Sequence, residues 1–357
     1  MLKYISSSQE FREFLESERA SLSTSDLKRL SSIKFKSAIH KLSKLDVDLV
    51  VDIIFPLYSS FGRPANDPAV YFRSFVLMLH LGYTSLKKWC FDVHHDLLLQ
   101  YLIGSWNVPS HSSHYDFINR FTHSHPHLND LLPQGFFSYK KPLAKPKSGD
   151  KLINFTKEDT ASLCDKYLND GAVFDRERMI YTLQTIFNAI AVIPSCDRGF
   201  IDSNNLILSG DGSALHIHAS PYGHKVIDDG NAVNTHRYSA KNADFGWDSD
   251  LETFYFGFTL YNISCHNPLK HIDLPVFIDL EKASRHDALS SISSFARLLD
   301  INPELLPKFM CFDSASDSTA VYQFLRHHNI IPIIDINQRN SGNNLYKNFD
   351  SISKNGK

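Results

Sequence analysis

Two aspartates occupy positions that are typical of metal-binding carboxylates. Asp211 lies in the segment SGDGS, inside a run of strand-forming residues, and its neighbouring glycines are expected to leave room for a ligand. Asp313 ends the apolar run KFMCFD, where a predicted strand passes into a helix. Ligands of open sheets gather at the carboxyl ends of strands. If these two strands are neighbours, both carboxylates face one cleft and form a hard oxygen site that suits Mg²⁺. Either aspartate alone is equally typical of a turn or a helix cap.

Other polar residues near these strands have simpler interpretations. His216, His218 and His224 alternate along a strand, a pattern more typical of one strand face than of a zinc site. Asp287, in the segment SRHD, is predicted to cap a helix, with a role in lining the site as the lesser alternative. Asp211 is followed by Gly and Ser, so the D-x-D pair of haloacid-dehalogenase phosphatases is absent.

The elements that must position the two aspartates lie in the second half of the chain. Strands are predicted over 205–218, 254–264, 274–280, 308–313 and 330–337, with helices over 286–299 and 317–328. This order predicts a mixed sheet with helices packed against it. The polar stretch 221–252 is too long for a tight hairpin and is predicted to be a functional or disordered loop.

The first half of the chain is predicted to be helical. Asp67 and Pro68 form a helix start, which Gly82 ends, and Ser113 with Asp116 has the spacing of a capping box. Such short capped helices fit a DNA-binding bundle of helix-turn-helix type and a purely structural bundle equally well.

Two segments connect the halves. Residues 140–151, KKPLAKPKSGDK, combine two prolines with five lysines and are predicted to be a linker, either a solvated tether or a contact to phosphate. A helix is expected over 179–190, ended by Pro194. We therefore expect an α+β protein with a helical domain at 1–139, the linker, connecting helices at 152–200 and a sheet domain at 201–357.

The composition is that of a globular protein. The 357 residues are 43% hydrophobic and 21% charged, which excludes wholesale disorder, and the net charge is −2. Residues 1–150 hold 18 basic against 14 acidic side chains, which mildly favours a polyanionic partner there. Five scattered cysteines indicate neither a zinc site nor a disulfide framework, and no apolar run is long enough for a membrane span. A cytoplasmic location without a membrane contact is expected.

Three stretches together resemble the bacterial insertion-sequence transposases of the DDE class. Residues 61–104 with 112–121 resemble the helical N-terminal domain of that family. SGDGSALHIHASPYGHK (209–225) resembles its first catalytic-acid strand. The segments 237–261, ASRHDA (283–288) and CFDSASDS (311–318) resemble the part that leads to the second acid.

The resemblance implies a helical bundle followed by a ribonuclease-H-like catalytic domain. Asp211 and Asp313 would be the first two members of an acidic triad that binds Mg²⁺ or Mn²⁺. The implied activity is cleavage and joining of transposon-end DNA by phosphoryl transfer. The implied partners are duplex DNA, at the terminal inverted repeats and the target, and a second copy of the chain in a nucleoid-associated complex.

The third acid of the family is a Glu on a helix after the fifth strand, and no Glu follows Glu304. Asp335 is the first candidate to replace it. The chain is expected to be truncated before this acid and inactive, and its sheet domain to be incomplete. The alternative is a non-catalytic DNA-binding protein that recognises transposon ends and inhibits the intact enzyme.

Several cationic and aromatic residues are candidate DNA contacts. For each of them, packing within the protein or a solvated surface is the alternative. These residues are Arg63, Arg73, Lys140, Lys141, Lys145, Lys147, Arg237, Tyr238, Lys241 and Trp247.

Overall fold

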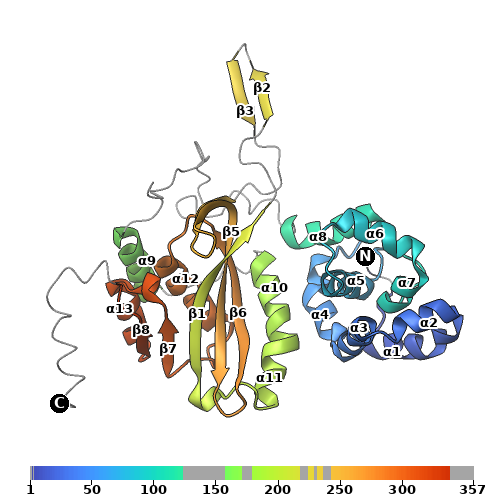
Figure 1. Ribbon diagram of the computed structural model, residues 1–357, viewed down its shortest axis with the longest axis horizontal. Helices are drawn as coiled ribbons and strands as arrows, with labels where there is room; N and C mark the ends of the chain where they lie inside the picture. The colour runs from blue at the N-terminus through green and yellow to red at the C-terminus, as the bar shows by residue number, and fades with distance from the viewer. Residues whose placement is uncertain are drawn as a thin grey trace. The chain divides into compact units, whose positions relative to one another are not determined.

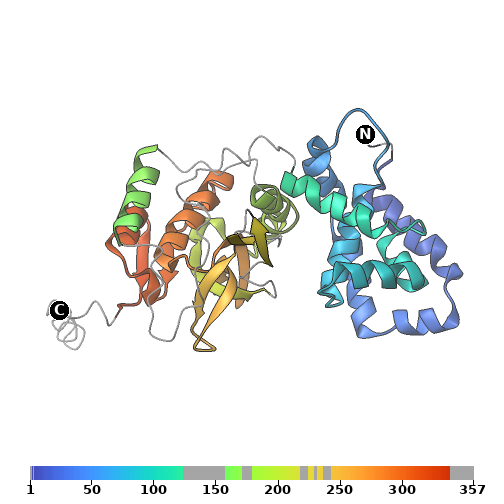
Figure 2. The same ribbon diagram turned by 90° about the horizontal axis from the view of Figure 1, so that it is seen from above.

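The computed structural model describes residues 2, 4–123, 157–170, 179–217, 224–228, 231–235 and 243–337. The chain divides into two compact units (Figures 1 and 2). The helical unit comprises Met1–Asp130 and Asp175–Pro194, and the sheet unit comprises Leu131–Phe174 and Ser195–Lys357. The predicted linker, 140–151, and the predicted boundary at 139 lie outside the described residues.

The helical unit is built from short helices. They are α1 (Ser8–Ser17), η1 (Glu18–Ser21), α2 (Thr24–Leu30), α3 (Ile33–Lys44), α4 (Val47–Ile54), η2 (Phe55–Leu57), α5 (Pro68–His80), α6 (Leu86–His95), α7 (Leu97–Ile103), α8 (His111–His123), α10 (Met179–Phe187) and the π-helical turn η3 (Asn188–Val192). The helix α11 (Ile193–Asp197) crosses the boundary between the two units.

Local sequence sets most of the helix ends. The Asp67 carboxylate accepts a hydrogen bond from the Ala69 N–H, and Pro68 is the first residue of α5, as predicted. Gly82 follows the C-cap of α5 with φ of 80°, a conformation that glycine adopts without strain. The predicted capping box of Ser113 is wrong: α8 begins at His111, and the Ser110 hydroxyl accepts from the Ser113 N–H.

Pro194 does not end the helix that begins at Met179. In the π-helical turn η3 the chain winds more widely, and the Ile193 N–H bonds to the Asn188 carbonyl. Pro194 then follows as the second residue of α11, directly after this wider turn. The expectation that Pro194 stops the helix is therefore wrong.

Two apolar clusters hold the helical unit together. Trp89 and Leu77 are fully buried in the larger cluster, where the Trp89 indole N–H donates to Ser74 Oγ over 2.8 Å. The second cluster contains Tyr71 of α5, Phe117 of α8 and Ile186 of α10. Helices from before and after the predicted linker therefore share one core.

The sheet unit contains one large mixed sheet and its helices. Its strands and helices are α9 (Lys157–Asp170), η4 (Ser203–Asn205), β1 (Ile207–His216), β2 (His224–Asp228), β3 (Asn231–Thr235), β4 (Asp244–Asp248), β5 (Thr253–Asn267), β6 (Ile272–Lys282), α12 (Asp287–Ile301), β7 (Phe309–Phe312), η5 (Ser314–Ser316), α13 (Thr319–His327) and β8 (Ile331–Ile334).

The strand order confirms the predicted mixed sheet. The path runs β4-β5-β1-β7-β8, and β6 also pairs with β5. β1 is antiparallel to β5 but parallel to β7, which is parallel to β8. The stretch 221–252, predicted to be a loop, contains β4 and the separate hairpin of β2 and β3. β4 was missed because its sequence, DFGWD, lacks an extended run of strand-forming residues.

The helices α9, α12 and α13 cluster beside the sheet (Figures 1 and 2). α12 contacts β1, β5 and β6, and its buried Arg297 forms ion pairs with Asp279 and Glu281 of β6. These two buried carboxylates raise the pKa of Arg297, against the opposing effect of burial. A buried ionic cluster therefore fixes α12 on the sheet.

No helix within the described ranges is long and apolar enough to cross a membrane. All five cysteines are free thiols, in agreement with the absence of a disulfide pattern from the sequence.

Candidate metal and nucleic-acid sites

Parallel pairing brings the two predicted aspartates to neighbouring strands. The register of β1 and β7 ends with Gly210 opposite Phe312, and the next residue on each strand is Asp211 and Asp313. Because paired residues of parallel strands point to the same face, both aspartates belong to one face of the sheet. Neighbouring strands lie about 4.8 Å apart. Both residues are exposed.

Local hydrogen bonds orient one oxygen of each carboxylate. Asp211 Oδ1 accepts from the Gly212 N–H over 2.8 Å. Asp313 Oδ1 accepts from the Ala315 N–H over 3.1 Å and so caps the short helix η5. In both cases the hydrogen-bonded atom is Oδ1.

The glycines beside Asp211 do not leave open space on the α12 side, contrary to the sequence expectation. A Cβ on Gly210 would lie 2.6 Å from the Phe312 ring and 2.8 Å from the Tyr261 hydroxyl. A Cβ on Gly212 would lie 2.9 Å from Thr259 Cγ2 and 3.0 Å from Asp287 Oδ1. The glycines allow close packing against β1 rather than ligand entry.

Asp287 is the residue that sequence reasoning undervalued. It is the first residue of α12, and the cap is instead His286, whose Nδ1 accepts from the Ala288 N–H over 3.2 Å. The prediction that Asp287 caps the helix is therefore wrong. In the sequence, Asp287 follows the third predicted strand and begins the next predicted helix. That position could have indicated that it lies near the sheet.

The three carboxylates act on one another electrostatically. Burial, followed by the charges of Asp313 and Asp211, raises the pKa of Asp287 to about 7. Partial burial of its carboxyl group also raises the pKa of Asp211, although the side chain as a whole is exposed; the Gly212 N–H opposes this rise, and Asp313 and Asp250 add to it. Each of the charged neighbours that shift these two pKa values is a carboxylate.

Asp335 and His216, which the sequence also offered as candidates near these acids, do not join them in the structure. Asp335 follows β8, is exposed, and contributes to neither of these pKa shifts. His216 Nε2 pairs with Asp248 Oδ2 over 2.7 Å, and its ring stacks on Tyr255. Across the described segments, no group of three or more His, Cys, Asp or Glu side chains is arranged to hold one metal ion.

The two predicted DNA contacts of the helical unit differ in exposure. Arg63 is exposed and lines a cavity of about 560 Å³ together with Arg120 and Asp116. Arg73 is fully buried, which contradicts its predicted contact with DNA. Its Nε donates to the Ile103 carbonyl and its Nη2 to Ser6 Oγ, while its guanidinium lies 4.4 Å from the centre of the Phe11 ring.

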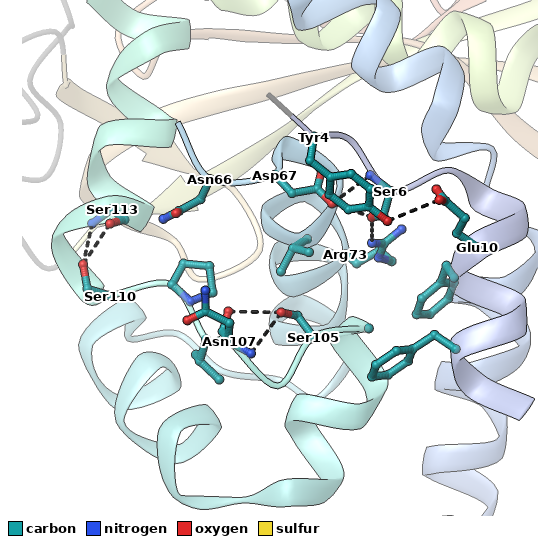
Figure 3. Close-up of a pocket in the computed structure, with 16 residues that line it drawn as sticks. Tyr4, Ser6, Glu10, Asn66, Asp67, Arg73, Ser105, Asn107, Ser110 and Ser113 are labelled. Carbon is teal, nitrogen blue, oxygen red and sulfur yellow. Dashed lines mark hydrogen bonds between the residues drawn. The ribbon is translucent and has the colours of Figure 1, made fainter. Parts of the chain in front are cut away.

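Arg73 belongs to the wall of a second cavity, of about 510 Å³ (Figure 3). Figure 3 shows Ser6 between Arg73 and Asp67, and both Ser6 N–H and Oγ donate to the Asp67 carboxylate. Glu10 lines the same cavity. Two carboxylates beside one buried guanidinium do not favour an anionic ligand here. Arg73 instead ties the N-terminal segment to α5 and α7.

The remaining predicted DNA contacts lie almost entirely outside the described residues. Only Trp247, on β4, is described; it is 45% exposed and packs edge-to-face on Phe254. The contacts outside the described residues are Lys140, Lys141, Lys145, Lys147, Arg237, Tyr238 and Lys241.

A comparison with protein families adds evidence from the helical unit. An α+β chain with N-terminal helices and a mixed sheet carries Asp211 within β1 and Asp313 directly after the neighbouring strand β7. Residues 33–120 match a family described as a transposase domain (DUF772). This match covers α3 to α8 of the helical unit and supports a transposase family. No curated protein and no solved structure matches the chain significantly.

Proposed function

We propose that this chain is a DNA transposase of the DDE class, with a ribonuclease-H-like sheet domain that cuts and joins transposon-end DNA. The observation that carries the proposal is the parallel register of β1 and β7, which aligns Asp211 with Asp313. The transposase-domain match in the helical unit supports it independently.

The donor set fits Mg²⁺ or Mn²⁺. Both ions prefer carboxylate oxygens, and the charged groups that raise the pKa of Asp211 are the carboxylates of Asp313 and Asp250. We therefore assign Asp211 and Asp313 as the residues that hold the ions. When bound, such ions supply an activated water and stabilise the leaving 3′ oxygen.

The protein's own residues contribute position and charge. The hydrogen bonds from the Gly212 and Ala315 N–H groups orient the two carboxylates before DNA binds. The helical unit is proposed to bind duplex DNA through exposed cations such as Arg63. The proposed complex contains two copies of the chain and both DNA ends. The sequence alone predicts inactivity because no Glu follows Glu304, and the cleavage assay below tests that expectation together with the proposal.

Cleavage of end DNA tests the proposal. The full chain is incubated with duplexes that carry the inverted repeats flanking its coding sequence, with Mg²⁺, Mn²⁺ or EDTA. We expect strand cleavage that requires the ion and is lost in Asp211→Asn and in Asp313→Asn. Asp273→Asn is the matched control, because Asp273 is exposed on β6 and its ion pair within the described residues is with His266, away from Asp211 and Asp313 in sequence.

Two results would count against the proposal. Ion-dependent binding of the end DNA without cleavage would favour the alternative of a non-catalytic DNA-binding protein. Cleavage that persists in both aspartate variants would refute the assignment of the site.

A further inference from the structure

The cavity of the helical unit that contains Arg63 and Arg120 has the features of a binding site. Its volume is about 560 Å³, and its walls come from α8, from α5 and from the segment that joins η2 to α5. Ligand pockets commonly measure about 300–1,000 Å³. The cavity is therefore large enough for a small molecule or for one unit of a polymer.

The charge of this cavity favours an anionic ligand. Arg63 is exposed and Arg120 is half-buried, and among the described lining residues only Asp116 is acidic. Asp116 and Arg120 are four residues apart on α8, a spacing at which opposite charges often pair. Within the described ranges, however, neither guanidinium forms an ion pair or a hydrogen bond, and Arg120 lies over the Tyr58 ring instead. Both guanidiniums are therefore available to a group such as phosphate.

Aromatic rings line the same cavity. Phe61 is 84% exposed, and the Arg120 guanidinium lies 4.4 Å from the centre of the Tyr58 ring. Tyr71 stacks on Phe117 with 5.0 Å between the ring centres. The Tyr58 hydroxyl is buried and has no hydrogen-bond partner in the described part of the chain, which marks a place where water or a ligand completes the bonding. Cations combined with aromatic rings are typical of sites for nucleotides whose bases are unstacked.

The segment before α5 presents an aromatic ring and a cation side by side in sequence. Gly62 separates Phe61 from Arg63 and has φ of 104°, a conformation that glycine adopts without strain. No atom lies within 4 Å of the position that a Cβ on Gly62 would occupy, so the turn is open. Asn66 Nδ2 donates to the Tyr71 hydroxyl over 2.9 Å and ties the end of the segment to α5. The turn is therefore exposed at its tip and held at its base.

We propose that this cavity binds one unpaired nucleotide of the DNA on which the chain acts, with the phosphate at Arg63 and Arg120 and the base against Phe61. The proposal rests on the proposed function, which supplies DNA as the source of the nucleotide. Bases of an intact duplex are stacked, whereas an unpaired base leaves the stack at a low energetic cost. A cavity with an exposed ring at its edge therefore fits an unpaired nucleotide better than the phosphates of an intact duplex.

DNA binding by the full chain in EDTA tests the proposal. Fluorescence anisotropy compares a blunt duplex of the terminal inverted repeat with the same duplex that carries a short unpaired overhang. Stacking of one base on an aromatic ring changes affinity about 5- to 150-fold. We therefore expect the overhang to tighten binding at least about fivefold, and Phe61→Ala to remove this gain. Arg120→Gln should also remove it, and should lower the slope of log affinity against log salt for the overhang duplex by about 0.7.

Two matched variants control for general effects on the surface. Phe91→Ala changes an exposed phenylalanine of α6, and Arg12→Gln changes an exposed arginine of α1, and neither residue lines the cavity. Both variants should keep the gain of the wild type. Thermal melting of each variant checks that it folds. Because the Phe61 ring is exposed, Phe61→Ala should melt like the wild type, and its result decides the proposal even if Arg120→Gln is unstable.

The outcomes separate this proposal from the proposed function. If the wild type binds both duplexes equally, or if Phe61→Ala and Arg120→Gln keep the gain, the cavity assignment is overturned and the proposed function stands. If deoxyadenosine monophosphate binds the wild type as tightly as the overhang duplex does, a free nucleotide is the ligand and the assignment to DNA is overturned. If the wild type binds neither duplex, this proposal and the proposed function are both overturned.

Discussion

The substitution Asp287→Asn should stabilise the metal-free protein at neutral pH. The pKa of Asp287 is raised from 3.8 to about 7, chiefly by burial and then by Asp313 and Asp211. One pKa unit corresponds to about 1.4 kcal/mol, so the charged carboxylate costs the folded state at most about 4 kcal/mol. Asn keeps the size of the side chain and removes this charge.

The pH dependence has a definite sign. Because the pKa of this acid is higher in the folded state, the folded state binds the proton more tightly, and stability is lost as pH rises from about 4 to about 7. Below the unfolded pKa the wild type and the variant should differ little, and above pH 7 the variant should be more stable. His286 and Tyr261, which lie near the same carboxylates, are present in both proteins, so their titration largely cancels in the comparison.

Scanning calorimetry in EDTA between pH 4 and 8 measures this difference and separates the transitions of the two units. Asp335→Asn is the control and should follow the wild type at every pH. A wild type that is more stable than Asp287→Asn at pH 8, or a difference that does not change with pH, would refute the electrostatic argument.

Three other substitutions test the buried ion pairs of α12, the packing of β4 and the DNA contacts. Arg297→Met leaves Asp279 and Glu281 buried without their partner, and urea unfolding should show a loss of about 3–5 kcal/mol; a loss below about 1 kcal/mol would contradict it. Gly246→Ala introduces a Cβ 2.4 Å from the Ala283 carbonyl oxygen, and calorimetry should show a loss of about 1–3 kcal/mol, whereas unchanged stability would mean that the strand can shift. Arg63→Ala should reduce the slope of log affinity for duplex DNA against log salt by about 0.9, and an unchanged slope would remove Arg63 from the interface.

Much of the fold follows from local sequence. The helix start at Asp67 and Pro68 is fixed by a side-chain cap and a preset φ angle, which depend only on neighbouring residues. The strands β1, β5, β6, β7 and β8 were predictable because runs of β-branched and aromatic residues favour extended structure. The prediction for Ser113 failed because Ser110, three residues upstream, supplies the hydroxyl that accepts a hydrogen bond at the start of α8. The prediction for Pro194 failed because the π-helical turn η3 precedes it and the helical winding continues.

For the site, the sequence by itself supplied two aspartates, each at the kind of position where carboxylates bind metal. It did not determine that β1 and β7 are neighbours, because strand pairing joins residues about a hundred positions apart and depends on the packing of the whole sheet. It also could not separate the exposed Arg63 from the buried Arg73, since burial is a property of the assembled core. Asp287 shows the same limit. A helix-starting aspartate is an ordinary cap in sequence, and only the packing of α12 on β1 brings it close enough to Asp211 and Asp313 for their charges to raise its pKa.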